Sequence, residues 1–193
     1  EAIASAASSG LDNLYFHVDW NQAAIDSDRV TREGNKPGDY VQWDPAEFLL
    51  VHGFNVVYVP DGFDFAQIRE AQKKALAINN GRPTGIVYRT VKGWKYGIEG
   101  KKSHGGGHKF YSDEYQQALQ PFEQKLGLKF PRFEGEKTPE SIEKAFYDSL
   151  QVIRQAFEAN PSLTGHLGDW IADSKRRLEA SPRPLRSDAP ELE

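Results

Sequence analysis

LDNLYFHVDWNQAAID, residues 11–26, is the stretch that decides the fold. Residues 14–18 form a short apolar and aromatic run, which predicts a β-strand buried on both faces. The run ends in Asp19, Asn21 and Asp26, whose side chains offer hard oxygen donors. Ligands of open α/β sheets bind beyond the carboxyl ends of strands, so a Mg²⁺ or Ca²⁺ carrying a phosphate is expected here. Asp and Asn are also common turn residues, so composition alone leaves open a plain capped turn.

Composition excludes several classes of protein. The chain has 193 residues, enough for one core with an appendage, and a net charge of −4. This charge argues against a general nucleic-acid binder, because no broad basic surface would neutralise phosphates. Without cysteine there is no disulfide, thiolate metal site or Cys nucleophile. No membrane-spanning apolar run and no signal peptide is visible, so we expect a cytoplasmic protein with no membrane partner.

Two features indicate a piece of a longer protein. The sequence contains no Met and therefore no initiator residue. It also opens on Glu-Ala-Ile-Ala-Ser-Ala-Ala, which is typical of a helix interior without a preceding cap. We therefore expect the chain to be a fragment.

Strands and helices are predicted to alternate through the first half of the chain. Apolar, β-branched runs predict strands near residues 14–19, 55–60 and 84–91. Between them, Asp44 followed by Pro45 marks a helix start, and residues 65–78 show helical spacing of apolar side chains. This alternation predicts an α/β fold with a parallel sheet and flanking helices. Residues 27–42 are polar and are predicted to form a loop.

The remainder is predicted to be a helical extension. One helix is expected over residues 113–126, a second after the Thr138 cap, and a third around residues 167–171. We divide the chain into a partial ligand-binding domain at residues 1–135, a helical extension at 136–180 and a linker or tail at 181–193.

A glycine-rich, basic segment at residues 92–108 follows the third predicted strand. Its glycines permit close approach of the backbone to a ligand, and its lysines and histidines suit an anion such as diphosphate. A flexible, solvated loop explains the same composition equally well.

Four motifs, in order and with matching spacing, resemble those of transketolases. Asp19, Asn21 and Asp26 match the family's Asp-x-Asn-x-x-x-x-Asp. The other three are a Gly-aromatic-x-Val strand running into Asp-Gly-x-Asp at residues 53–64, a Pro-led strand ending in Thr at 83–90, and Ser-His-Gly at 103–105.

The resemblance covers roughly residues 1–130 and implies the thiamine diphosphate-binding fold, lacking its first strands. It implies an enzyme of carbohydrate metabolism and the pentose phosphate pathway that moves a two-carbon ketol unit between sugar phosphates. The implied cofactors are thiamine diphosphate and Mg²⁺ or Ca²⁺. The implied partners are sugar phosphate substrates, the remaining transketolase domains and a second copy in a homodimer.

The resemblance also assigns site residues. Asn21 corresponds to a metal ligand that uses its side-chain oxygen next to the cofactor, and Ala23 to a ligand that uses its backbone carbonyl. Gly93 and His104 are assigned to the cofactor, and His104 also to catalysis, because a loop histidine can bind the phosphate and move protons. We interpret His17 and His52 as structural.

The sequence departs from the transketolase pattern in several places. The Gly-Asp-Gly motif that supplies a third metal ligand and the domain that binds the aminopyrimidine ring are outside the sequence. Lys92 replaces an apolar residue, and the loop at 27–42 is longer than usual. The isolated chain is therefore expected to be inactive. A related synthase, for deoxyxylulose phosphate or dihydroxyacetone, and a non-catalytic α/β assembly domain are the alternatives.

Overall fold

The computed structural model describes residues 2–181, and the chain divides into two compact units, Glu1–Ala118 and Leu119–Glu193. The first unit contains α1 (Ala2–Ser8), β1 (Tyr15–Trp20), α2 (Pro45–Val51), β2 (Asn55–Val59), α3 (Phe65–Ala77) and β3 (Thr84–Arg89). The helices that follow are α4 (Asp113–Leu126), in which the boundary falls, α5 (Pro139–Glu158) and α6 (Pro161–Ala180). The predicted domain limits stay predictions, and all but the first residue of the 181–193 tail lies outside the described residues.

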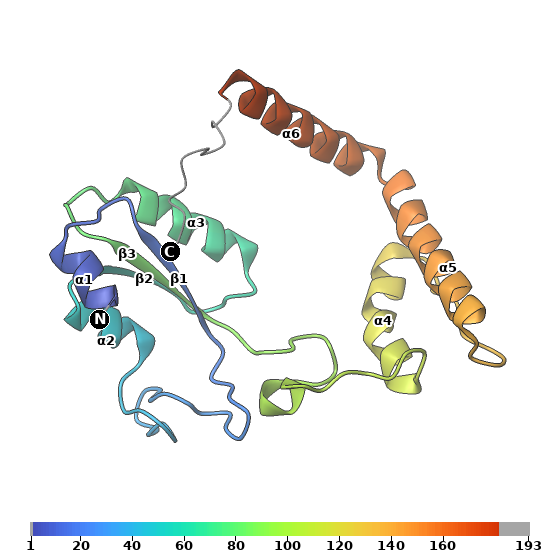
Figure 1. Cartoon of the computed structure of the whole chain (residues 1–193), viewed down its shortest axis with the longest axis horizontal. Helices are drawn as coiled ribbons and strands as arrows, with labels where there is room; N and C mark the ends of the chain where they lie inside the picture. Colours follow the sequence, from blue (N-terminus) through green and yellow to red (C-terminus); the bar gives the residue numbers. More distant parts are fainter. Residues whose placement is uncertain (1, 182–193) are drawn as a thin grey trace, which may run out of the picture. The chain divides into compact units, whose positions relative to one another are not determined.

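The three strands form one parallel sheet in the order β1-β3-β2. β3 is the central strand because β1 and β2 both pair with it, with Tyr15 and Asn55 opposite Thr84. The α/β fold with a parallel sheet, flanking helices and a helical C-terminal part is thus confirmed (Figure 1).

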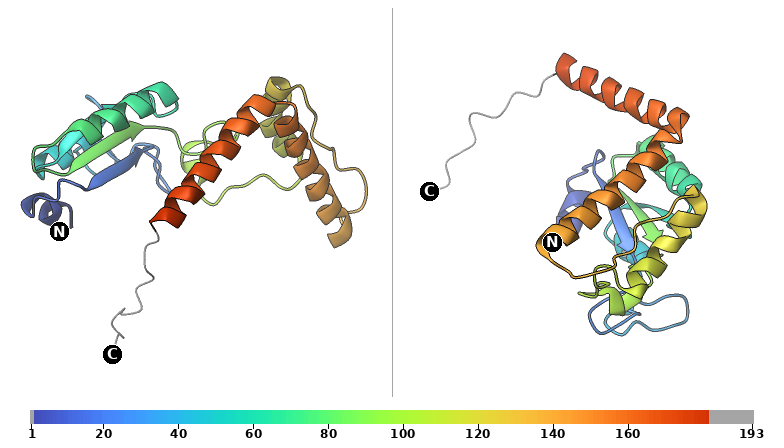
Figure 2. Two further views of the ribbon diagram at one scale, coloured as in Figure 1. Left: turned by 90° about the horizontal axis from the view of Figure 1, so that it is seen from above. Right: turned by 90° about the vertical axis from the view of Figure 1, so that its right-hand side faces the viewer.

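Helices cover both faces of the sheet in the first unit (Figures 1 and 2). On one face, Ala6 of α1 and Leu49 of α2 pack with Trp20 and Val87. On the other face, α3 contributes Ala71 and Ala75 to a cluster that contains Val57, Val59 and Ile86. The small alanine side chains let α3 lie close to the sheet. Most of the buried strand residues belong to β2 and β3, so the core is centred on these two strands.

The prediction that the first strand is buried on both faces is wrong. Only Trp20 is buried in β1, and Phe16, His17 and Asp19 are exposed. The reason is topological, because β1 is the edge strand of the described sheet and has a neighbour on one side only. An apolar run predicts a strand, but its position in the sheet depends on pairings that the run does not encode.

The helix starts follow local capping, as predicted. Asp44 accepts a hydrogen bond from the Glu47 N–H at 2.9 Å, and the Glu47 carboxylate accepts one from the Asp44 N–H. Thr138 and Ser141 form the same reciprocal arrangement at the start of α5. Each capping box satisfies N–H groups that have no partner within the helix.

The second unit forms its predicted helices without a comparable core. α5 carries its apolar face as predicted, but Phe146, Leu150 and Phe157 on that face are exposed. In the same way Trp170 of α6 is 74% exposed. None of the helices in the described part of the chain combines the length and the apolar character needed to cross a membrane.

Candidate functional site

The segments that leave the three strands start side by side at the carboxyl end of the sheet. The Thr90 N–H donates to the Trp20 carbonyl at 3.2 Å, and the Gly62 N–H donates to the Arg89 carbonyl at 2.9 Å. Gly62 must be glycine, since a Cβ there would lie 2.8 Å from that same carbonyl oxygen and 2.5 Å from the Thr90 methyl carbon. Parallel pairing thus brings together the polar residues that follow β1, β2 and β3.

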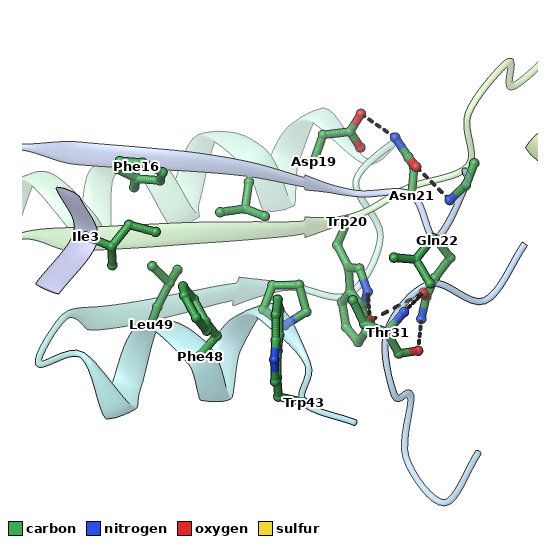
Figure 3. Close-up of a pocket in the computed structure, with 14 residues that line it drawn as sticks. Ile3, Phe16, Asp19, Trp20, Asn21, Gln22, Thr31, Trp43, Phe48 and Leu49 are labelled. Atoms are coloured by element: carbon green, nitrogen blue, oxygen red, sulfur yellow. Dashed lines mark hydrogen bonds between the residues drawn. The ribbon is translucent and has the colours of Figure 1, made fainter. Parts of the chain in front are cut away.

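Asp19, Asn21 and Thr90 form a hydrogen-bonded cluster at this edge. The Asn21 Nδ2 donates to Asp19 Oδ2 at 3.0 Å, and the Thr90 hydroxyl donates to Asp19 Oδ1. The Ala23 N–H donates to Asn21 Oδ1 at 2.9 Å, which closes a tight turn directly after the strand (Figure 3). The structure therefore brings the two predicted metal ligands, Asn21 and Ala23, into direct contact.

Gln22, between these two residues, adopts a left-handed backbone conformation with φ of 62°. This conformation is uncommon for a residue with a side chain and needs support from its surroundings. The support comes from Thr31, whose N–H donates to Gln22 Oε1 at 2.9 Å and whose carbonyl accepts from Gln22 Nε2 at 3.1 Å. Trp20 Nε1 also donates to the Thr31 hydroxyl at 2.8 Å, and all three side chains are buried (Figure 3).

The oxygen atoms of this turn fit part of a hard-cation site. Asn21 Oδ1 retains a second lone pair beyond the one used by Ala23, and no described residue donates a hydrogen bond to the Ala23 carbonyl. Amide and carbonyl oxygens are ligands that Mg²⁺ and Ca²⁺ accept. Within residues 2–181, no three His, Asp or Glu side chains are grouped to hold a metal, so the turn supplies two neutral donors and no carboxylate cluster.

Asp26, the third polar residue of the sequence cluster, is engaged elsewhere. Its Oδ1 accepts a hydrogen bond from the Tyr40 hydroxyl. Asp61 and Asp64, which follow β2, serve the backbone: Asp61 accepts from the Phe63 N–H at 3.0 Å and Asp64 caps α3. The backbone N–H groups of that helix end lower the pKa of Asp64 below its usual value.

The loop at residues 27–42 is fixed to the carboxyl end of β3. The Arg89 guanidinium donates to both Glu33 oxygens, at 2.5 and 3.1 Å, and lies over the Trp20 ring at 5.5 Å. This bidentate pair lowers the pKa of Glu33. Asp28 of the same loop accepts from the Lys101 N–H at 2.5 Å, so it also contacts the glycine-rich loop.

The glycine-rich loop folds back on itself. Gly93 has a φ of 74°, and a Cβ there would lie 2.2 Å from the Ile98 carbonyl oxygen, so only glycine fits. Lys92 Nζ donates to Ser103 Oγ at 2.9 Å, which joins the start of the loop to its short 3₁₀ helix at Gly100–Ser103. Lys92, which replaces an apolar residue of the transketolase pattern, is therefore part of the loop's own framework.

His104 differs from the other histidines of the chain. The ring of each of the others lies within hydrogen-bond distance of another residue, and they are His17, His52, His108 and His166. Among the described residues none is hydrogen-bonded to the His104 imidazole, and the residue is exposed. It lies directly after the short 3₁₀ helix at Gly100–Ser103. No hydrogen bond joins His104 to Asn21 within the described chain.

An apolar cavity of about 370 Å³ lies beside the turn (Figure 3). Apolar side chains of three elements line it, among them Ile3 of α1, Phe16 of β1 and Phe48 of α2, and Asp19 and Asn21 of the turn line it as well.

Comparison with known proteins supports one class for this fold. No family model matches the sequence. Among solved structures, a transketolase from Pichia stipitis, whose title names a complex with xylulose 5-phosphate, aligns over 92% of this chain and 25% of its own, with a TM-score of 0.52 and 21% identity. A transketolase from Campylobacter jejuni aligns over 81% of this chain and 22% of its own, with a TM-score of 0.51 and 18% identity. The fold is thus that of part of a thiamine diphosphate-binding domain.

The sequence comparison also finds a resemblance to a transketolase. A transketolase from Physarum polycephalum is 27% identical over 193 residues, which is 98% of this chain and 28% of that protein. The resemblance to transketolase is therefore confirmed, and the chain corresponds to a segment of such an enzyme. It spans about a quarter of the length of the proteins it matches.

Two supports of the candidate site were missed by sequence reasoning. Gln22 and Thr31 fix the turn, and Glu33 fixes the loop on β3. Nothing in their spacing marks them, because each acts through a contact made only in the folded chain. The longer loop at 27–42 was the one available signal, since an extended insertion beside a site is often functional.

Proposed function

We propose that the chain is part of a transketolase-like transferase that moves a two-carbon ketol unit between sugar phosphates. In this proposal it supplies part of the site for a divalent metal, Mg²⁺ or Ca²⁺, and for thiamine diphosphate. The observation that carries the proposal is the turn from Asn21 to Ala23, which presents two oxygen donors at the carboxyl end of β1. It occurs in a chain that resembles transketolase over nearly its whole length.

The residues of the site have separate roles in this proposal. Asn21 Oδ1 and the Ala23 carbonyl would bind the cation that neutralises the diphosphate. Gly93 would contact the cofactor through its backbone, in a loop conformation that only glycine allows because of its φ of 74° and the adjacent Ile98 carbonyl. His104, whose exposed imidazole has no hydrogen-bond partner among residues 2–181, would bind phosphate and transfer protons during carbon–carbon bond cleavage. When bound, thiamine diphosphate would stabilise the carbanion that this cleavage generates.

The larger assembly is part of the same proposal. Sugar phosphate substrates, the remaining transketolase domains, a homodimer, a cytoplasmic location and a place in the pentose phosphate pathway are all expected for the intact enzyme. In this proposal the described residues supply two metal ligands and part of a cofactor pocket, so the isolated chain should have no activity of its own.

Calorimetry of the isolated chain tests this last point. Mg²⁺ requires near-octahedral coordination and is usually bound through carboxylates and substrate phosphates, which the two neutral donors of this chain do not provide. We therefore expect no heat of binding at micromolar concentrations of Mg²⁺ and thiamine diphosphate. Micromolar, Mg²⁺-dependent binding of the cofactor would contradict the proposed division of the site.

Two variants of the intact enzyme test the roles of the residues. Asn21→Ala should raise the metal and cofactor concentrations needed for activity, with turnover partly restored at saturation. His104→Ala should lower turnover by on the order of 10²-fold even at saturating cofactor, because it removes a proton-transfer group. Steady-state titrations of cofactor and donor sugar measure both effects.

His166→Ala is the matched control, since it removes an exposed histidine from α6. It should leave unchanged both the cofactor concentration needed for activity and the turnover at saturating cofactor. Full rescue of His104→Ala by excess cofactor would reduce His104 to a phosphate contact, and unaltered kinetics in both site variants would refute the proposed site.

A further inference from the structure

The side-chain amide of Asn21 lies between two neighbours of opposite hydrogen-bonding character. Its Nδ2 donates to Asp19 Oδ2 at 3.0 Å, and its Oδ1 accepts from the Ala23 N–H at 2.9 Å. An ionised carboxylate can only accept and a backbone N–H can only donate. Of the two orientations of the amide, only the one with its oxygen toward Ala23 satisfies both neighbours.

Asp19 is itself held in place from the neighbouring strand. Its Oδ1 accepts from the Thr90 hydroxyl, while its Oδ2 faces Asn21. The Thr90 backbone is tied to the end of β1 through the Trp20 carbonyl, and Asp19 lies opposite Tyr88 in the parallel ladder. Each carboxylate oxygen therefore has its own donor, and the carboxylate connects the carboxyl ends of β1 and β3.

We propose that Asp19, fixed by Thr90, is the positioning residue that directs the Asn21 oxygen rather than its NH₂ group toward the cation. The inference rests on the proposed metal site and adds a residue to it. Asp19 does not bind the cation in this arrangement. It acts by holding the ligand, in the way that outer partners of metal ligands fix the orientation of those ligands.

The proposal makes a specific prediction for Asp19→Leu, which keeps a similar side-chain size but accepts no hydrogen bond. The Asn21 NH₂ then loses its partner, and the amide is held from the Ala23 side alone. It can rotate and turn its NH₂ toward the cation, so metal affinity should fall about 10- to 100-fold.

Hydrogen exchange in the 193-residue chain reports the orientation of the Asn21 side-chain amide in the absence of metal. In the unaltered chain the Ala23 backbone amide is protected by Asn21 Oδ1. Asp19→Leu should raise its exchange rate by up to about fivefold, the value of one ordinary hydrogen bond. No hydrogen bond joins residue 19 to Ala23 within the described chain, so two-dimensional ¹⁵N NMR detects an effect that passes through Asn21.

Three further variants separate positioning from charge and from general loss of structure. Asp26→Asn makes the same change of charge in a carboxylate that bonds to Tyr40, and it should leave Ala23 exchange unchanged. Thr90→Val keeps the charge of Asp19 but removes the hydroxyl that donates to it. It should raise the Ala23 exchange rate, but by less than the substitution of Asp19 does. Thr90→Ser keeps a hydroxyl and should leave the Ala23 amide as protected as it is in the unaltered chain.

A titration with manganese chloride tests the consequence for the cation. Paramagnetic broadening of the Ala23 signal should appear at millimolar Mn²⁺ in the unaltered chain and need about tenfold more in Asp19→Leu. Unchanged Ala23 exchange in Asp19→Leu, or faster exchange with unchanged broadening, would overturn the inference. Broadening that is absent from Ala23 in the unaltered chain would count against the proposed metal site, while the exchange data still decide whether Asp19 positions Asn21.

Discussion

The two units of this chain contain well-formed helices, but they bury apolar side chains to very different extents. In the first unit, Leu49, Val59, Ile86 and Val87 are all at most 2% exposed. In the described part of the second unit, Ala145 is the one buried hydrophobic residue. The difference shows that local capping and spacing are sufficient to specify a helix, whereas a core requires apolar faces that pack against one another.

The helices of the second unit are supported mainly by local interactions. α5 has its capping box and ion pairs one turn apart, from Lys144 to Asp148 at 2.6 Å and from Arg154 to Glu158 at 2.7 Å. Exposed pairs of this kind contribute only a few tenths of a kcal/mol each. The helices of the first unit have in addition the packing of their apolar faces on the sheet.

Truncation of a leucine in each unit gives the largest test of this comparison. Leu49 contacts the core around Trp20, so Leu49→Ala should lower the free energy of unfolding by about 2–5 kcal/mol. Leu150→Ala, at a position 58% exposed, should change it by less than about 0.5 kcal/mol. Urea unfolding followed by tryptophan fluorescence and circular dichroism measures both. Equal losses would show that the α5 face is buried in solution.

Removal of a helix cap in each unit is expected to have an intermediate effect. Thr138→Ala should cost about 1 kcal/mol of helix stability and reduce the helical signal, since Ala145 is the one residue of α5 that is buried in the described chain. Asp44→Ala removes the equivalent cap of α2 at a similar cost, but the packed sheet should preserve the helical signal. Circular dichroism at 222 nm distinguishes the two results. An unchanged signal in Thr138→Ala would contradict the view that α5 depends on its cap.

Acidification should give the smallest effect, in the first unit. The hydrogen bond from Arg89 lowers the pKa of Glu33 in the folded chain below its usual 4.5. The stabilisation is therefore present above pH 4.5 and is lost as the pH falls through the lowered pKa, by at most about 1 kcal/mol for a pair this exposed. Urea unfolding at pH 6 and pH 3 should show a smaller acid loss in Glu33→Gln than in the unaltered chain. An equal loss would mean that Glu33 contributes nothing.

Local signals in the sequence predicted most elements of the fold correctly. The apolar runs gave three parallel strands, and Asp44 and Thr138 gave the starts of two helices. The same signals predicted less well which apolar side chains are buried. Phe65 and Leu76 fit the apolar spacing of α3, yet they are 85% and 67% exposed, because only the Ala71 and Ala75 side of this helix reaches the sheet.

The sequence by itself determined the elements, their order and the resemblance to transketolase, because strand runs, caps and motif spacing are properties of neighbouring residues. The tertiary structure decided which side chains meet. Asp19 and Thr90 are 71 positions apart, and Gln22 is anchored nine positions away on Thr31. It also left β1 at the sheet edge and joined Asp26 to Tyr40. These contacts depend on the pairing of β1 with β3 and on the path of the long loop, and neither is encoded in the local pattern of residues.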